Sequence, residues 1–139
     1  MAISTDGGAN YGDFYTDGFL IEPWYGCNAS FLRVELDDLS EDEKALLPEG
    51  AEDVTVFINP RFLKARKNMS ACVSFDGGKT YSHVKLFTED PSAYSSLAYS
   101  SATSEFCLIY EKGVPEDINN PYKLGITSVI FDLEWLLNK

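Results

Sequence analysis

The sequence predicts an all-β fold, and two observations lead to that prediction. Short runs rich in β-branched and aromatic residues recur along the chain, separated by Gly, Asp, Asn and Pro, which is typical of antiparallel strands joined by turns. In addition, a phrase with the pattern Ser-x-Asp-Gly-Gly-x-x-Tyr occurs twice, at residues 4–11 and 74–81. We expect strands at residues 29–36, 53–59, 71–75, 83–86, 94–99, 105–110 and 127–133.

The repeated phrase predicts a turn that is held together by its own side chains. The aspartate, Asp6 or Asp76, can accept backbone N–H groups, and the two glycines after it can adopt a positive φ. The closing aromatic, Tyr11 or Tyr81, is expected to insert into a core. This is the Asp-box pattern, a hairpin turn that recurs in certain β-propellers, and an internal repeat indicates architecture better than any single residue does.

The length of the chain limits how much of a propeller it can form. At 139 residues it matches about one ordinary domain, whereas a complete propeller needs about four to eight blades of four strands. The two phrases begin at Ser4 and Ser74, a spacing that suits one blade with an insertion. We therefore expect residues 1–139 to form one partial propeller domain of about two to three blades, as a fragment of a larger whole.

One segment departs from the strand pattern and predicts a short inserted helix near residues 40–47. Ser40, with Glu43 three residues later, forms a capping-box pattern, acidic residues follow Ser40 in the first turn, and Pro48 ends the run.

Composition and charge exclude several classes of partner. Hydrophobic residues make up 45% of the chain, enough to bury a core. The net charge of -11 argues against nucleic acid and anionic membranes, which both attract basic surfaces. Nine of the 22 acidic residues fall between Glu35 and Asp53, as expected of a solvated face. We find no apolar run of the ~18 residues that a membrane helix needs, and no signal segment.

The cysteines give no sign of a disulfide framework or a metal site. Cys27, Cys72 and Cys107 are an odd number, without paired or metal-ligand spacing. We expect three buried free thiols, no metal and no cofactor.

Three residues could carry chemistry, and each has a plainer alternative. Arg66 can grip a carboxylate with two parallel hydrogen bonds, or belong to a solvated basic cluster. Tyr94 can act as a nucleophile if a carboxylate base activates it, or simply pack in a strand. Glu111, at a strand end, can orient an arginine or be a solvated charge. His83, the only histidine, is expected to have no catalytic role.

Several segments together resemble the C-terminal part of the sialidase (neuraminidase) family. The second Asp box and the segments around the three residues above follow the order and spacing of that family, as do an upstream segment and the tail, which resembles the closing strand of the family. These segments are residues 22–30, 66–69, 74–81, 93–97, 108–111 and 130–136. The likeness covers nearly the whole chain, least well in the acidic insertion.

This resemblance implies a six-bladed propeller that removes terminal sialic acid from glycans with retention of configuration, through a tyrosine nucleophile. By resemblance, Tyr94 matches that nucleophile and Arg66 matches the third arginine that binds the sialic acid carboxylate. Glu111 matches the glutamate that steadies the first arginine. The other two arginines, the aspartate acid/base and the activating glutamate belong to earlier blades, so we expect no sialoside hydrolysis by this chain alone.

The main alternative is a non-catalytic Asp-box module that binds glycans or proteins, because Asp boxes lie far from the active site of the family. A degenerate fragment without function is a third possibility. The expected partners are sialylated glycans if the site is complete, and otherwise the missing blades or a second copy. The resemblance implies a secreted, lysosomal or periplasmic protein. Some relatives bind calcium, but no loop here has convincing ligand spacing.

Overall fold

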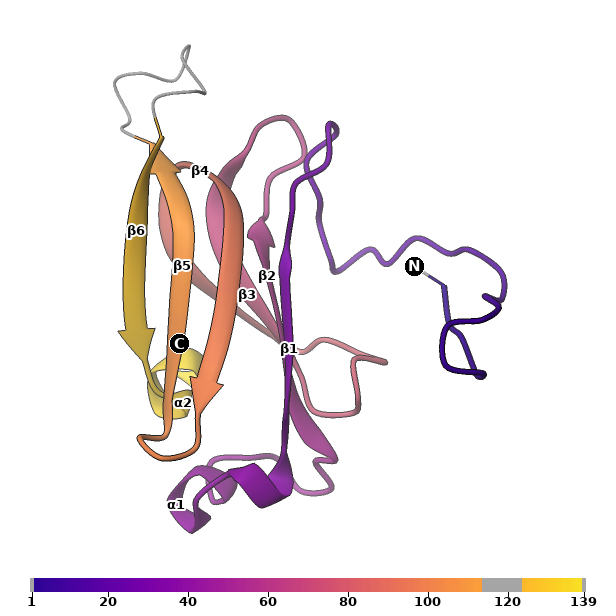
Figure 1. Ribbon diagram of the computed structural model, residues 1–139, viewed down its shortest axis with the longest axis vertical. Helices are drawn as coiled ribbons and strands as arrows, with labels where there is room; N and C mark the ends of the chain where they lie inside the picture. The colour runs from indigo at the N-terminus through magenta and orange to yellow at the C-terminus, as the bar shows by residue number, and fades with distance from the viewer. Residues whose placement is uncertain (1, 114–123, 139) are drawn as a thin grey trace.

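Six antiparallel strands, paired in the order in which they occur along the chain, form the body of the protein (Figure 1). The computed structural model describes residues 2–113 and 124–138, and it confirms the predicted all-β fold. The strands are β1 (Ser30–Glu35), β2 (Asp53–Pro60), β3 (Lys67–Ser74), β4 (His83–Ser100), β5 (Glu105–Gly113) and β6 (Leu124–Phe131).

The long strand β4 curls the sheet into a half-barrel. Its first half pairs with β3 and its second half with β5. A hydrogen bond of 2.7 Å between the hydroxyls of Ser30 on β1 and Ser95 on β4 joins the two halves across the curl. The predicted strands 83–86 and 94–99 are therefore parts of one strand. Pro91 lies where the pairing register shifts, a position at which strands tolerate proline.

The core fills the concave side of this curl. Alternate residues of the strands point into it, as the two-residue period of a strand requires. Phe106 and Phe131 stack inside with ring centroids 5.3 Å apart. The other fully buried side chains of the core include Val54, Val56, Ile58, Met69, Ala71, Val73, Leu108, Leu133 and Leu136.

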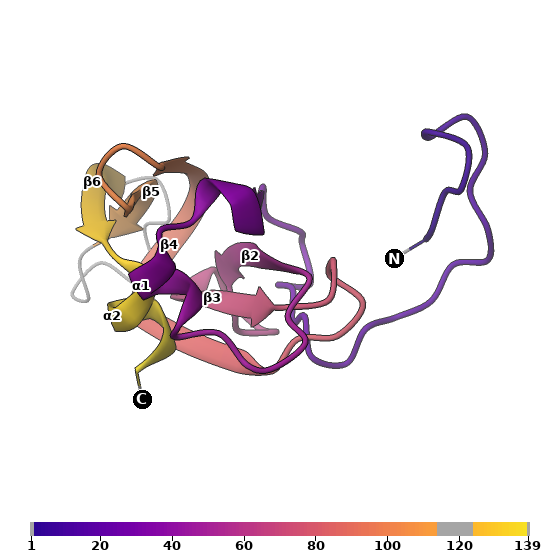
Figure 2. The ribbon, with the colours of Figure 1, turned by 90° about the horizontal axis from the view of Figure 1, so that it is seen from below.

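Two short helices lie at one end of the sheet (Figures 1 and 2). Helix α1 (Glu41–Lys44), which follows a 3-10 turn at Leu36–Asp38, begins with the predicted capping box. Helix α2 (Leu133–Leu137) was not predicted. The expected last strand, 127–133, ends at Phe131, and the tail that resembles a closing strand turns into α2 because Asp132 caps its first turn by accepting from Trp135 N at 2.7 Å.

Both Asp boxes form the predicted self-bonded turn. In the second box, which joins β3 to β4, Ser74 Oγ donates to Asp76 Oδ1 and accepts from Gly78 N. Tyr81 is 8% exposed and stacks on Phe19, so it inserts into the fold as expected.

The first Asp box has the same internal bonds but different surroundings. Ser4 Oγ donates to Asp6 Oδ1 and accepts from Gly8 N. This box lies in an N-terminal segment that extends away from the sheet (Figure 1), and Tyr11 is 64% exposed. The expectation that Tyr11 inserts into a core is therefore wrong for this structure.

Two further expectations concern the burial of the cysteines and the length of the helices. All three cysteines are free, but only Cys72 is buried, while Cys27 and Cys107 are half-buried. Within the described residues, the helices are too short to cross a membrane.

Candidate functional site

The structure brings together the three residues that the sequence singled out. Tyr94 lies on β4 just after the register shift, Glu111 lies near the end of β5, and Arg66 immediately precedes β3. A hydrogen bond of 2.9 Å from Ser92 N to the Arg66 carbonyl ties the Arg66 loop to β4. The C-terminal end of β5 lies opposite the end of the sheet that carries α1 and α2 (Figure 1).

Arg66 lies over the face of the Tyr94 ring. Its guanidinium carbon is 5.1 Å from the ring centroid, within the range of a cation–π contact. Its Nε donates to the carbonyl oxygen of Gly26 at 3.1 Å. No carboxylate among residues 2–113 and 124–138 lies within ion-pair distance of Arg66. The terminal guanidinium nitrogens thus have capacity for an anion from outside the chain.

Glu111 is bonded to the backbone of Tyr94. One carboxylate oxygen, Oε2, accepts a hydrogen bond of 3.2 Å from Tyr94 N. The Tyr94 side chain itself is 46% exposed. This arrangement fixes the backbone that carries the phenol, while the residue stays partly exposed to solvent.

A turn far from Arg66 in sequence completes the site. Gly26, whose carbonyl holds Arg66, has a φ of +68°, a conformation that favours glycine. Cys27 follows it. Burial raises the pKa of the Cys27 thiol. The guanidinium of Arg66 lowers this pKa, whereas the carboxylates of Glu111 and Glu22 raise it further. Sequence reasoning did not place Gly26 or Cys27 at this site. The contact from Gly26 is a backbone carbonyl, which leaves no residue signature.

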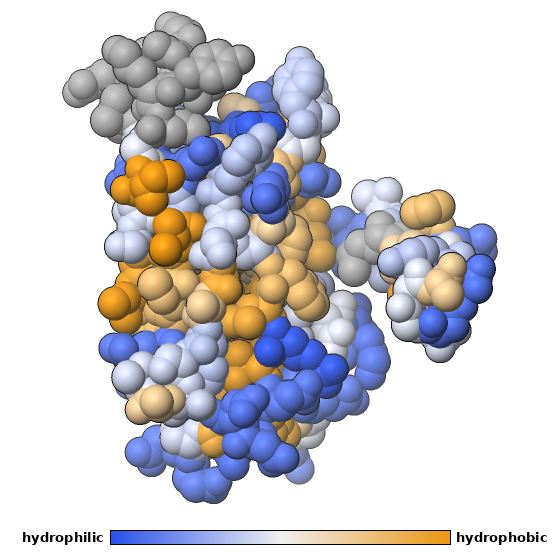
Figure 3. Space-filling model, in the orientation of Figure 1, coloured by the Kyte–Doolittle hydropathy of each residue, from blue (hydrophilic) through white to orange (hydrophobic). Residues whose placement is uncertain are grey.

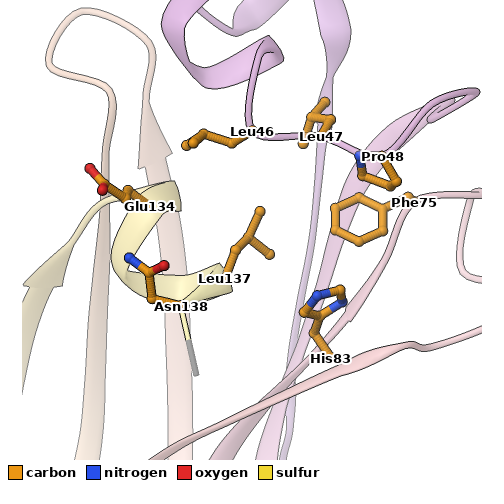
Figure 4. A pocket seen from close by; sticks show the side chains of 8 residues that line it. All are labelled: Leu46, Leu47, Pro48, Phe75, His83, Glu134, Leu137 and Asn138. Carbon is orange, nitrogen blue, oxygen red and sulfur yellow. The ribbon is translucent and has the colours of Figure 1, made fainter.

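His83 lies elsewhere, at the start of β4. Its ring packs edge-on against Phe75 and its Nδ1 is 3.0 Å from Ser82 Oγ. It lines a cleft of about 370 Å³ between the α1 loop and α2, whose walls are both apolar and polar (Figure 4). The residues that line this cleft are Leu46, Leu47, Pro48, Phe75, His83, Glu134, Leu137 and Asn138.

The described part of the chain contains no group of three or more His, Cys, Asp or Glu residues arranged to hold a metal ion. The candidate site consists of the exposed Tyr94 phenol, the Arg66 guanidinium stacked on it, and the Glu111 carboxylate bonded to the Tyr94 backbone.

Comparisons with known proteins relate the chain to sialidases. It is 29% identical over 136 residues to a sialidase from Micromonospora viridifaciens, covering 98% of this chain and 18% of that protein. It also matches the crystal structure of the intramolecular trans-sialidase from Ruminococcus gnavus in complex with oseltamivir carboxylate. That match has a TM-score of 0.69 at 18% identity, and covers 99% of this chain and 28% of the other. No protein-family model matches the sequence.

The structural match shows that the curled sheet is a fold found within the trans-sialidase. The chain spans less than a third of the length of either protein. Because the sequence similarity runs through nearly the whole chain, the chain is homologous to the sialidase family and corresponds to a small part of such a protein.

Proposed function

We propose that this chain forms the last blades of a six-bladed sialidase-type propeller and contributes Tyr94, Arg66 and Glu111 to an exo-α-sialidase site. One observation carries the proposal. Three residues that the resemblance picks out from separate segments lie in contact at one end of the sheet, linked by the Arg66–Tyr94 stacking and the Tyr94–Glu111 hydrogen bond.

Arg66 is suited to bind the carboxylate of a sialic acid. Because the Gly26 carbonyl accepts from Nε, the planar group is held in one orientation, and no residue among 2–113 and 124–138 forms an ion pair with its two terminal nitrogens. A guanidinium makes two parallel hydrogen bonds to a carboxylate, which the single ammonium of a lysine cannot do.

Tyr94 is the proposed nucleophile. A neutral phenol avoids the repulsion that a carboxylate nucleophile would meet from an anionic sugar. An ordinary phenol has a pKa of about 10 and needs a carboxylate base nearby to react at neutral pH. Glu111 holds the Tyr94 backbone in place, and we assign the base, the acid/base aspartate and two further arginines to other blades. This chain by itself is therefore expected to bind sialosides weakly and to cleave none.

The binding half of the proposal is tested by NMR titration of the chain with methyl α-sialoside. Shifts should appear at the backbone amides of Tyr94 and Glu111, and Arg66→Ala should abolish them. Lys64→Ala removes a neighbouring exposed charge of the same cluster and should leave the shifts intact. Equal loss in both variants would mean that Arg66 acts only as part of a solvated basic cluster.

The catalytic half requires the chain to be joined to the missing blades. In such a protein, Tyr94→Phe should lower the release of a fluorophore from a sialoside by at least about a thousandfold, because the attacking oxygen is gone. Unchanged release would refute the role of Tyr94. Sialoside binding through Arg66 without any release in the unsubstituted protein would instead favour a non-catalytic glycan-binding module.

A further inference from the structure

Two aromatic side chains face solvent on a tight turn beside Arg66. Gly26 N donates to the carbonyl of Pro23 at 2.8 Å, which closes a four-residue turn. Trp24 and Tyr25 occupy its two central positions and are 69% and 89% exposed. Large aromatic surfaces left in water beside a polar site are typical of binding surfaces.

The turn is held in a fixed position relative to the proposed anion site. At one side, Trp24 N donates to the Leu63 carbonyl at 2.9 Å, in the loop that leads to Arg66. At the other side, the Gly26 carbonyl accepts from Arg66 Nε at 3.1 Å. Tyr25 directly precedes Gly26, and successive Cα atoms are about 3.8 Å apart, so the Tyr25 backbone lies one residue from the carbonyl that binds Arg66.

The chemistry of this pair suits a neutral sugar. Trp and Tyr combine a flat apolar face, which can cover the C–H face of a pyranose, with a polar edge that can reach a hydroxyl. A glycan whose terminal acidic sugar is bound by Arg66 must place its next sugar within one ring length of that group. Phe14, which is 87% exposed, lies earlier in the N-terminal segment, and among the described residues no hydrogen bond joins Phe14 to Arg66 or to its loop.

We infer that Trp24 and Tyr25 form a stacking platform for the neutral sugar that carries the terminal acidic residue. The inference rests on the proposed function and extends it. The site then selects sialylated oligosaccharides over free sialic acid and over sialosides with a small alkyl group.

The two tryptophans of the chain make this inference testable by NMR. Trp24 and Trp135 each give one indole N–H signal, and Trp135 packs against Phe87 and Phe131 at the other end of the sheet. Trp24→Phe assigns the signals. Sialyllactose should shift the Trp24 signal and leave the Trp135 signal in place, whereas methyl α-sialoside should shift the amides of Tyr94 and Glu111 and leave the Trp24 signal unmoved.

Affinity measurements on variants complete the test. Trp24→Ala should weaken sialyllactose binding by roughly tenfold and leave methyl α-sialoside binding unchanged, and Phe14→Ala, the matched loss of an exposed aromatic, should alter neither. Unchanged sialyllactose affinity in both Trp24→Ala and Tyr25→Ala would overturn the platform while leaving the proposed function standing. If neither ligand binds the unsubstituted chain, the binding half of the proposed function fails, and the platform with it.

Discussion

Asp76 holds the second Asp box together. It accepts hydrogen bonds from the Thr80 hydroxyl at 2.6 Å and from Thr80 N at 2.8 Å, and these bonds lower its pKa to about 2. Asp6 makes the corresponding bonds to Asn10 in the first box, and its pKa is also about 2. The two turns thus have corresponding internal hydrogen bonds, and they differ in the residues that surround them.

Because the two boxes differ in their surroundings, replacing the aspartate by alanine should destabilise the fold more in the second box than in the first. Asp76→Ala should lower the free energy of unfolding by about 1 kcal/mol, because the second box joins β3 to β4 and places Tyr81 against Phe19. Asp6→Ala should leave the free energy of global unfolding nearly unchanged, because its box lies away from the sheet. Urea denaturation measures both, and equal losses would contradict the reasoning.

The same aspartate gives a pH dependence with a defined sign. Its pKa in the folded chain is about 2, below the 3.8 of an ordinary aspartate, so its contribution to stability is complete above about pH 4 and is lost as the pH falls towards 2. The unsubstituted chain should therefore lose more stability than Asp76→Asn between pH 5 and pH 2. Asp6→Asn should follow the unsubstituted chain although the pKa of Asp6 is also about 2, because its box lies away from the sheet and its bonds can break without global unfolding.

At the level of elements, sequence patterns located most strands and failed where tertiary contacts decide. Pro91 and the polar residues around it suggested a break, but the structure continues β4 through a register shift. The apolar tail suggested a strand, but Leu133 and Leu136 are buried three residues apart, which is helical spacing. The cap at Asp132 is the local signal that could have revealed α2.

The candidate site shows the same division between what sequence can and cannot predict. Arg66, Tyr94 and Glu111 could be selected because the family resemblance rests on side-chain identity. The turn that holds Arg66 could not be selected in this way, because it contacts Arg66 through the backbone carbonyl of Gly26, 40 residues away in sequence. The bond from Tyr94 N to Glu111 likewise depends on the β4–β5 register, which short motifs do not specify.

Glu43 attaches helix α1 to the β4–β5 hairpin. Its buried carboxylate accepts hydrogen bonds from the hydroxyls of Tyr99 and Ser104, each at 2.9 Å, in addition to closing the capping box with Ser40. Burial raises the pKa of Glu43, but the hydrogen bonds from these three residues outweigh it, and its pKa is lowered. Burial, and then the Glu43 carboxylate, raise the pKa of Tyr99 to about 12.

Removing this carboxylate should loosen the helix from the sheet. Glu43→Ala should lower the free energy of unfolding by about 2 to 3 kcal/mol, because two hydroxyls lose a charged partner and the helix loses part of its cap. Glu41→Ala, on the same helix but with a side chain that is 90% exposed, is the control and should lower the free energy of unfolding far less than Glu43→Ala does. Chemical denaturation that gave equal costs would show that Glu43 does not anchor α1.

At the scale of the whole molecule, the outer face of β5 and β6 is apolar and open. Ile126 and Ile130 are 73% and 65% exposed on β6, and Ile109, which pairs with Ser128 between them, is 45% exposed on β5. Figure 3 shows apolar surface gathered over these two strands. In the strand order of the sheet β6 has a neighbour on one side only, so an unpaired strand edge adjoins this face.

An apolar face beside an unpaired edge favours association with another sheet. If the missing blades normally cover this face, the chain alone should self-associate, and light scattering should give a mass that rises with concentration.

Ile126→Lys with Ile130→Lys should restore a monomer, because lysines on an edge strand repel a second copy. Ile3→Lys, the same change at a residue that is 62% exposed on the N-terminal segment, should leave association intact. A monomer at every concentration in the unsubstituted chain would show that this face is tolerated in water, and would remove the argument that other blades are needed to cover it.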